Sequence, residues 1–199
     1  MRRAFAHLPL LRLLNQGWRL LAWWQLLCMA MCLTMAGQAQ AQGVELSSLQ
    51  LTREDAALTL EYSARLKLSY ALEDALKRGV PMYFVAQATV WRSRWFWRDE
   101  RIAQINRSWR LSYQPLAATW RLSLGGLAQS FPTLSEALAP LSRVTGWRIT
   151  ELERLDPAEH YTVEFSFQLD NSQLPQPMQI DLGSDWKLSI VRSLPVAGP

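Results

Sequence analysis

Cysteine and histidine are nearly absent from this chain, which has two of each in 199 residues. Cys28 and Cys32 lie in an apolar N-terminal stretch, and His160 is the only histidine after residue 41. Zinc sites use several Cys, His or carboxylate ligands, and a Ser-His or Cys-His nucleophile needs a positioned histidine. After residue 41 we therefore expect no disulfide, no metal centre and no cofactor, and we predict that the protein is not an enzyme.

An excess of either charge is also missing once the first 41 residues are set aside. Lys and Arg number 21 against 17 Asp and Glu, and four of the arginines precede residue 42: Arg2, Arg3, Arg12 and Arg19. The rest of the chain is neutral, so its overall charge gives no argument for binding nucleic acid.

Residues 1–41 have the three parts of a secretory signal peptide. The arginines are followed by an apolar stretch over 20–36 and by the small-x-small cleavage site Ala39-Gln40-Ala41. As a helix the stretch would span about 25 Å, less than the roughly 30 Å hydrocarbon core of a bilayer. We predict cleavage before Gln42 and export by the general secretory route, with a retained membrane anchor as the alternative. Residues 42–199 should then form a single β-rich domain without a membrane span.

Strict alternation of apolar and polar residues dominates the chain after the leader and predicts antiparallel strands with one wet face. It is clearest over 58–68 and 161–169, and we expect further strands over 44–51, 82–91, 103–113, 120–124, 147–152 and 186–192. Gly125-Gly126 should form a bend, and Pro175 and Pro177 a rigid connection.

Two short helices interrupt these strands. Ser69 can cap one that ends at Gly79, and Thr133 to Glu136 is a capping box for one that should fail near Pro140. The fold class is therefore mainly β, an antiparallel β-sandwich or half-barrel with two short covering helices, with α+β as the alternative.

One segment, residues 91–110, combines four tryptophans with six arginines and only two acids. Residues 151–170 hold six acids against Arg154 alone, so the domain should be electrically lopsided. The candidate binding residues of the basic segment are Trp91, Arg92, Arg94, Trp95, Trp97, Arg98, Arg101 and Arg107.

The apolar face of the strand over 82–90 is even-numbered, but Trp91, Trp95 and Trp97 are odd. A hairpin that turns near Arg98-Asp99 would place Ala88 opposite Trp109 and leave Trp91 and Trp95 on the outer face. The alternative is a bulge near Arg92-Ser93, which would return these tryptophans to the core. Exposed rings would favour an arginine-tryptophan platform that binds an anionic ligand or a protein.

Several ordered motifs resemble the proteobacterial family called domain of unknown function 4390. They are Arg78-Gly79-Val80-Pro81, Arg94-Trp95-Phe96-Trp97-Arg98-Asp99-Glu100, Trp109-Arg110-Leu111-Ser112-Tyr113, Gly146-Trp147-Arg148 and the segment 169–177. The resemblance implies an exported protein of the cell envelope with no catalytic residues to transfer. It also implies association with a sensor kinase of the nitrogen-regulation type, beside which members are often encoded.

Three hypotheses follow for the function. The first is a non-enzymatic periplasmic domain of a Gram-negative bacterium that binds an anionic envelope ligand or an envelope protein through the 91–110 hairpin. The second is an accessory regulator that contacts the periplasmic loop of a membrane sensor kinase. The third is a hydrolase with an unrecognised pair of carboxylates, which would have to converge across a cleft.

Overall fold

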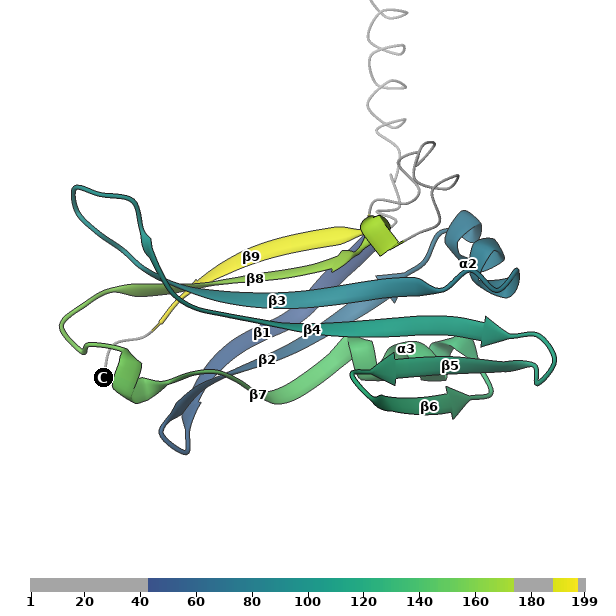
Figure 1. Ribbon diagram of the computed structural model, residues 1–199. Helices are drawn as coiled ribbons and strands as arrows, with labels where there is room; N and C mark the ends of the chain where they lie inside the picture. Colours follow the sequence, from purple (N-terminus) through teal and green to yellow (C-terminus); the bar gives the residue numbers. More distant parts are fainter. Residues whose placement is uncertain (1–42, 174–187, 197–199) are drawn as a thin grey trace, which may run out of the picture. The chain divides into compact units, whose positions relative to one another are not determined.

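The computed structural model describes residues 43–173 and 188–196, and its strands form two antiparallel sheets (Figure 1). The smaller sheet has the strand order β1-β2-β7 and the larger one the order β6-β5-β4-β3-β8-β9. The first contains β1 (Gly43–Glu54), β2 (Ala57–Lys67) and β7 (Arg143–Glu151). The second contains β3 (Met82–Arg92), β4 (Glu100–Gln114), β5 (Thr119–Leu124), β6 (Leu127–Phe131), β8 (Tyr161–Leu169) and β9 (Ser189–Pro195).

The predicted fold class is confirmed, because the two sheets form a β-sandwich and do not close into a barrel. The alternation of apolar and polar residues accounts for the packing of the two sheets. The odd residues of β8 from Tyr161 to Leu169 and the even residues of β3 from Met82 to Val90 are all buried. Each strand therefore turns one face toward the opposite sheet.

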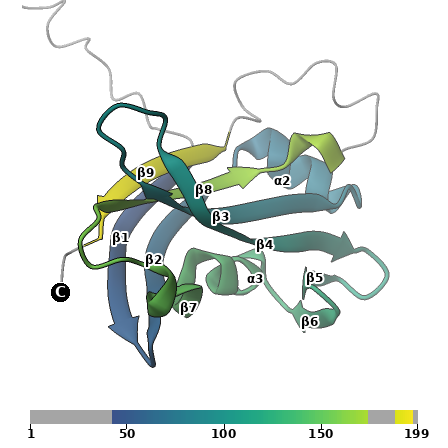
Figure 2. The same ribbon diagram turned by 60° about the vertical axis from the view of Figure 1, so that its left-hand side comes forward.

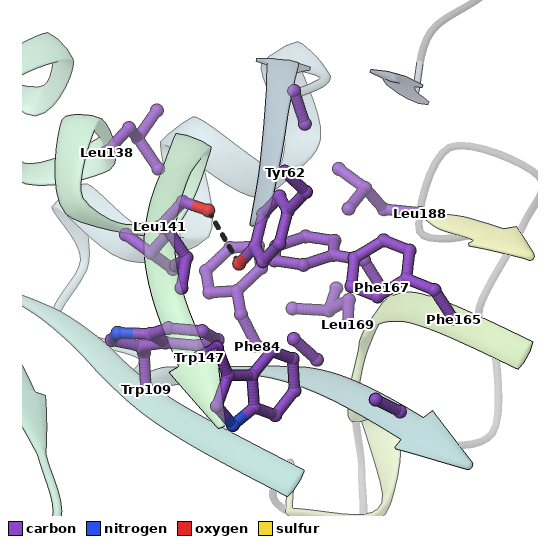
Figure 3. Packing of buried hydrophobic residues seen from close by; sticks show 14 of the residues in the cluster. Tyr62, Phe84, Trp109, Leu138, Leu141, Trp147, Phe165, Phe167, Leu169 and Leu188 are labelled. Carbon is purple, nitrogen blue, oxygen red and sulfur yellow. Dashed lines mark hydrogen bonds between the residues drawn. The ribbon is translucent and has the colours of Figure 1, made fainter. Parts of the chain in front are cut away.

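Aromatic rings fill the space between the two sheets (Figure 3). The ring centroids of Tyr62 on β2 and Phe165 on β8 lie 4.8 Å apart, and those of Phe84 and Phe167 lie 6.2 Å apart. The Tyr62 hydroxyl donates a hydrogen bond of 3.0 Å to the carbonyl of Leu141. Burial raises the pKa of Tyr62 above its ordinary value, although the charge of Arg107 opposes the shift. The tyrosine thus stays neutral in the core and joins the two sheets to a covering helix.

Both predicted helix starts are confirmed. Ser69 Oγ accepts the backbone N–H of Leu72 at 3.3 Å at the start of α2 (Tyr70–Lys77). Thr133 Oγ1 accepts the backbone N–H of Glu136 at 3.2 Å at the start of α3 (Leu134–Ser142). Two short 3-10 turns, η1 (Leu152–Arg154) and η2 (Asn171–Gln173), flank β8.

The expected end of the second helix near Pro140 is two residues too early, because α3 runs on to Ser142. Proline has no N–H to donate to the carbonyl one turn before it, which weakens the helix there. Leu138 and Leu141, on either side of Pro140, are nonetheless buried. Their packing against the sheets holds the last turn in place.

The expected register of the β3–β4 hairpin is wrong. Ala88 lies opposite Ile105 and not Trp109, and Trp109 lies opposite Phe84. The alternative, a bulge near Arg92-Ser93, is close to the observed register shift, which falls between Val90 and Trp91 with Ile102 as the extra residue on β4. This bulge does not return Trp95 and Trp97 to the core, because both side chains are exposed. The hairpin is displaced because its last strand pair is Arg92 with Glu100, so the loop is centred on Phe96 and not on Arg98-Asp99 as expected.

One strand, β6, was not predicted. Leu124 pairs with Leu127, so Gly125-Gly126 forms a two-residue hairpin turn, with Gly125 at a φ of +58° that suits glycine. All residues of β6 except Phe131 are exposed, which leaves no apolar alternation to detect. The predicted strand over 186–192 begins at Ser189 in the described residues.

The leader, residues 186–187 and the pair Pro175 and Pro177 lie outside the described residues. In the part of the chain that the structure describes, no helix combines the length and apolar character needed to cross a membrane.

Candidate functional site

The loop between β3 and β4, residues 93–99, carries the most exposed aromatic cluster in the described residues; we call it the tip loop. Trp95, Phe96 and Trp97 are 89%, 90% and 78% exposed. Trp95 and Phe96 contact each other edge to face, with centroids 5.6 Å apart. In both ribbon views the tip loop projects beyond the paired ends of β3 and β4 (Figures 1 and 2). Neither sheet covers the three rings.

The base of the tip loop is held by charge pairs and backbone contacts. Arg92 and Arg94 both form ion pairs with the carboxylate of Glu100. The Ser93 N–H donates to the carbonyl of His160 at 2.9 Å, which ties the loop to the start of β8. The hydrogen bond from Arg92, together with the two positive charges, lowers the pKa of Glu100, and the same hydrogen bond raises the pKa of Arg92. Two of the arginines therefore order the loop.

A shallow hollow of about 390 Å³ lies under the tip loop on the outer face of the larger sheet. Trp91 lines it and is half-buried, and Thr162 pairs with Trp91 across the β3–β8 ladder. The complete lining is Trp91, Arg98, Asp99, Thr162, Glu164 and Ser193. A wider hollow of about 690 Å³, lined by Trp95, Phe96, Trp97 and Arg98, lies against the loop itself.

Asp99 and Glu164 are the two carboxylates that line the smaller hollow. Asp99 Oδ1 also accepts the backbone N–H of Arg94 at 3.4 Å, a contact within the loop. This gives Asp99 a structural role. Within residues 43–173 and 188–196, no three Cys, His, Asp or Glu side chains come together as a metal site would require.

Arg107 does not belong with the other candidate residues. It lies opposite the buried Ala86, on the core-facing side of β4, and its guanidinium carbon sits 5.1 Å from the ring centroid of Trp147. Burial lowers its pKa. Arg107 therefore covers a core tryptophan by a cation–π contact, whereas Arg101 is exposed at the start of β4 and donates to Gln104 Oε1 at 2.7 Å.

Seven of the eight candidates thus surround the tip loop or its base, and the acidic segment lies beside them. Glu164 on β8 pairs with Thr89 on β3, and Glu159 contributes to the raised pKa of Arg92. The expected charge separation is consequently weaker than the distance along the chain indicates, because antiparallel pairing of β3 with β8 brings the two segments together.

Sequence reasoning missed Phe96 as a candidate residue, although its position between two tryptophans was an available signal. It also missed Thr162, Glu164 and Ser193, which reach the hollow only through the pairing of β8 with β3 and β9. No local motif marks these three residues.

A β-sandwich that presents an exposed aromatic loop, without a metal cluster in its described residues, defines a class of architecture but no activity. The chain belongs to the family described as Domain of unknown function (DUF4390), which it matches over residues 41–194. No curated protein and no solved structure matches the chain significantly.

Proposed function

We propose that this protein is an exported, non-enzymatic binding domain whose contact surface is the tip loop. The observation that carries the proposal is the exposure of Trp95, Phe96 and Trp97 at the end of a hairpin whose base is fixed by ion pairs and a backbone hydrogen bond. Contiguous exposed aromatic rings on a soluble surface are typical of interaction sites. Tryptophan and arginine are also the residue types that most often dominate binding energy.

Export is supported by the signal-like composition of residues 1–41 and by the family match, which begins at residue 41, beside the proposed cleavage site. Fractionation of cells that make the full chain, followed by intact mass, tests this part of the proposal. We expect a periplasmic species that starts at Gln42. A full-length species with Met1 in the cytoplasm would contradict it.

A site-specific photocrosslinker tests the contact surface. We would place it at Phe96 and, in a matched control, at Leu116, which is fully exposed in the turn between β4 and β5. Irradiation of cell envelopes should give an adduct, protein or lipid, from position 96 and none from position 116. Equal adducts from both positions, or none from either, would contradict the proposal. An adduct with a sensor kinase would identify the protein as its accessory regulator.

A further inference from the structure

We infer that the tip loop inserts into the headgroup region of a bilayer that contains anionic phospholipid. This inference rests on the proposed function and names its partner. The inserted residues are Trp95, Phe96 and Trp97, and Arg98 beside them contacts the lipid phosphates.

The type of exposed side chain fits this partner. Tryptophan combines a large apolar ring with an N–H donor, and it concentrates where hydrocarbon meets headgroups. In the tip loop two tryptophans flank a phenylalanine, and the three rings are 78% to 90% exposed. The one aromatic contact among them is between Trp95 and Phe96. The rings are therefore available to enter an interface without leaving the core of the domain.

The size and shape of the surface favour a membrane over a protein. Three rings that bury about 150–250 Å² each offer on the order of 500 Å². A specific protein interface buries about 800 Å² on each partner. The tip loop projects from the end of the sheet (Figure 2), and the β8 and β9 residues that line the hollow beneath it, Thr162, Glu164 and Ser193, are polar and add no aromatic surface. Insertion into lipid needs no matching partner surface, because the interface closes around the loop.

The arginines of the tip loop complement an anionic surface, although Glu164 of β8 lines the same hollow as Arg98. Residues 91–101 contain four arginines, Arg92, Arg94, Arg98 and Arg101, against Asp99 and Glu100. Glu100 is occupied by Arg92 and Arg94 at the base. Arg98, next to Trp97, has no ion pair with a carboxylate among the described residues. Cations beside an inserted apolar group strengthen binding to anionic lipid.

The attachment of the loop permits insertion without unfolding. Ser93 is held by the His160 carbonyl and Arg94 by Glu100, so the chain on the β3 side of the rings is already ordered. The conformational cost of binding is thereby reduced.

Co-sedimentation with vesicles tests the inference, using protein purified as cells process it, with its N-terminus fixed by intact mass. The vesicles are phosphatidylcholine alone, or phosphatidylcholine mixed with phosphatidylglycerol. We expect binding to the mixed vesicles that weakens as salt is raised. The double variant Trp95→Ala/Trp97→Ala should bind them about tenfold or more weakly, and Leu116→Ala should bind as the parent does.

A pair of charge-reversal variants distinguishes the effect of a charge at the tip loop on vesicle binding from the effect of the protein's net charge. Arg98→Glu should weaken binding to the mixed vesicles by about tenfold or more. Arg121→Glu changes the net charge equally at an exposed position on β5 and should have little effect. Equal losses from both variants would overturn the placement of the contact at the tip loop.

Quenching by brominated lipid provides a second readout that does not depend on affinity. Bromine near the headgroups should quench tryptophan emission in the parent, and Trp95→Phe/Trp97→Phe should remove most of that quenching. Absence of binding by the parent to mixed vesicles, or equal binding by the tryptophan double variant, would overturn the membrane inference. If position 96 still gave protein adducts in envelopes, the proposed function would stand with a protein as the partner. If the crosslinker at position 96 gave no adducts, the proposed function and the membrane inference would both be contradicted.

Discussion

Two pairs of tryptophans lie in opposite environments, one in the core and one at the tip loop. Trp109 and Trp147 are each 2% exposed between the sheets, whereas Trp95 and Trp97 are bare at the tip of the β3–β4 hairpin. Trp109 and the tip pair belong to the same hairpin, so the difference is one of position. The core tryptophans lie where the two sheets overlap, and the tip pair lies beyond the last strand pair, Arg92 with Glu100. Burial of Trp109 and Trp147 stabilises the fold, whereas the exposed Trp95 and Trp97 have no packing role. We therefore assign Trp95 and Trp97 to binding.

Removal of a core tryptophan should have the largest effect on stability. Trp147→Ala leaves a cavity between the sheets and removes the surface on which Arg107 stacks. We expect the free energy of unfolding to fall by about 3–5 kcal/mol, measured by urea denaturation. A loss below about 1 kcal/mol would mean that the core closes around the gap and that the buried pair is less important than its packing indicates.

Loosening the base of the tip loop should have an intermediate, local effect. The pKa of Glu100 is lowered by Arg92 and Arg94, so the ordering that it provides is present at neutral pH. That ordering is lost as the pH falls below about 4, through the ordinary and then the lowered pKa of the glutamate. The anisotropy of a fluorophore on Phe96→Cys should therefore drop with acid, and Glu100→Gln should show the low value at every pH.

Glu151→Gln is the matched control for that experiment, because Glu151 pairs with Arg148 at 3.3 Å on β7, away from the loop. Its pH profile should follow that of the parent. An unchanged acid transition in Glu100→Gln would show that another group orders the loop.

The smallest effect on stability should come from the exposed pair. Trp95→Ala/Trp97→Ala removes two large side chains, but neither packs against the core. We expect the free energy of unfolding to stay within about 0.5 kcal/mol of the parent. Differential scanning calorimetry of this variant and of Trp147→Ala gives the comparison directly. A large loss of stability in the double variant would show that Trp95 and Trp97 stabilise the folded domain.

The sequence was enough to predict the sandwich, because each strand buries one face and alternation reports that face. It was also enough to predict the two helix caps, since Ser69 and Thr133 make their contacts within three residues. β6 was not predicted because Phe131 is its one residue that is not exposed, so the strand has no buried face that alternation could report. Local signals therefore identified the elements, where such signals exist.

The register of the strands, and therefore which residues pair across them, was harder to predict. The Ile102 bulge and the position of the tip loop, centred on Phe96, together determine which residues of β3 and β4 face each other, and neither has a local signature strong enough to place it. Arg107 resembled its neighbours in sequence but lies on the core side, because it is two residues before Trp109 on the same strand and so shares its face, in the expected register as in the observed one. The candidate site could thus be located from the sequence, while its membership depended on long-range pairing.

Cysteine protection in intact envelopes tests the central claim most directly. In a chain with Cys28→Ala and Cys32→Ala, a single Phe96→Cys or Leu116→Cys reports access of a water-soluble maleimide at the tip loop or at a distant exposed turn. The account predicts equal labelling of both sites in the purified protein, and slow labelling of position 96 alone in the envelope. Labelling of position 96 at the same rate in both settings would contradict a role for the tip loop in binding.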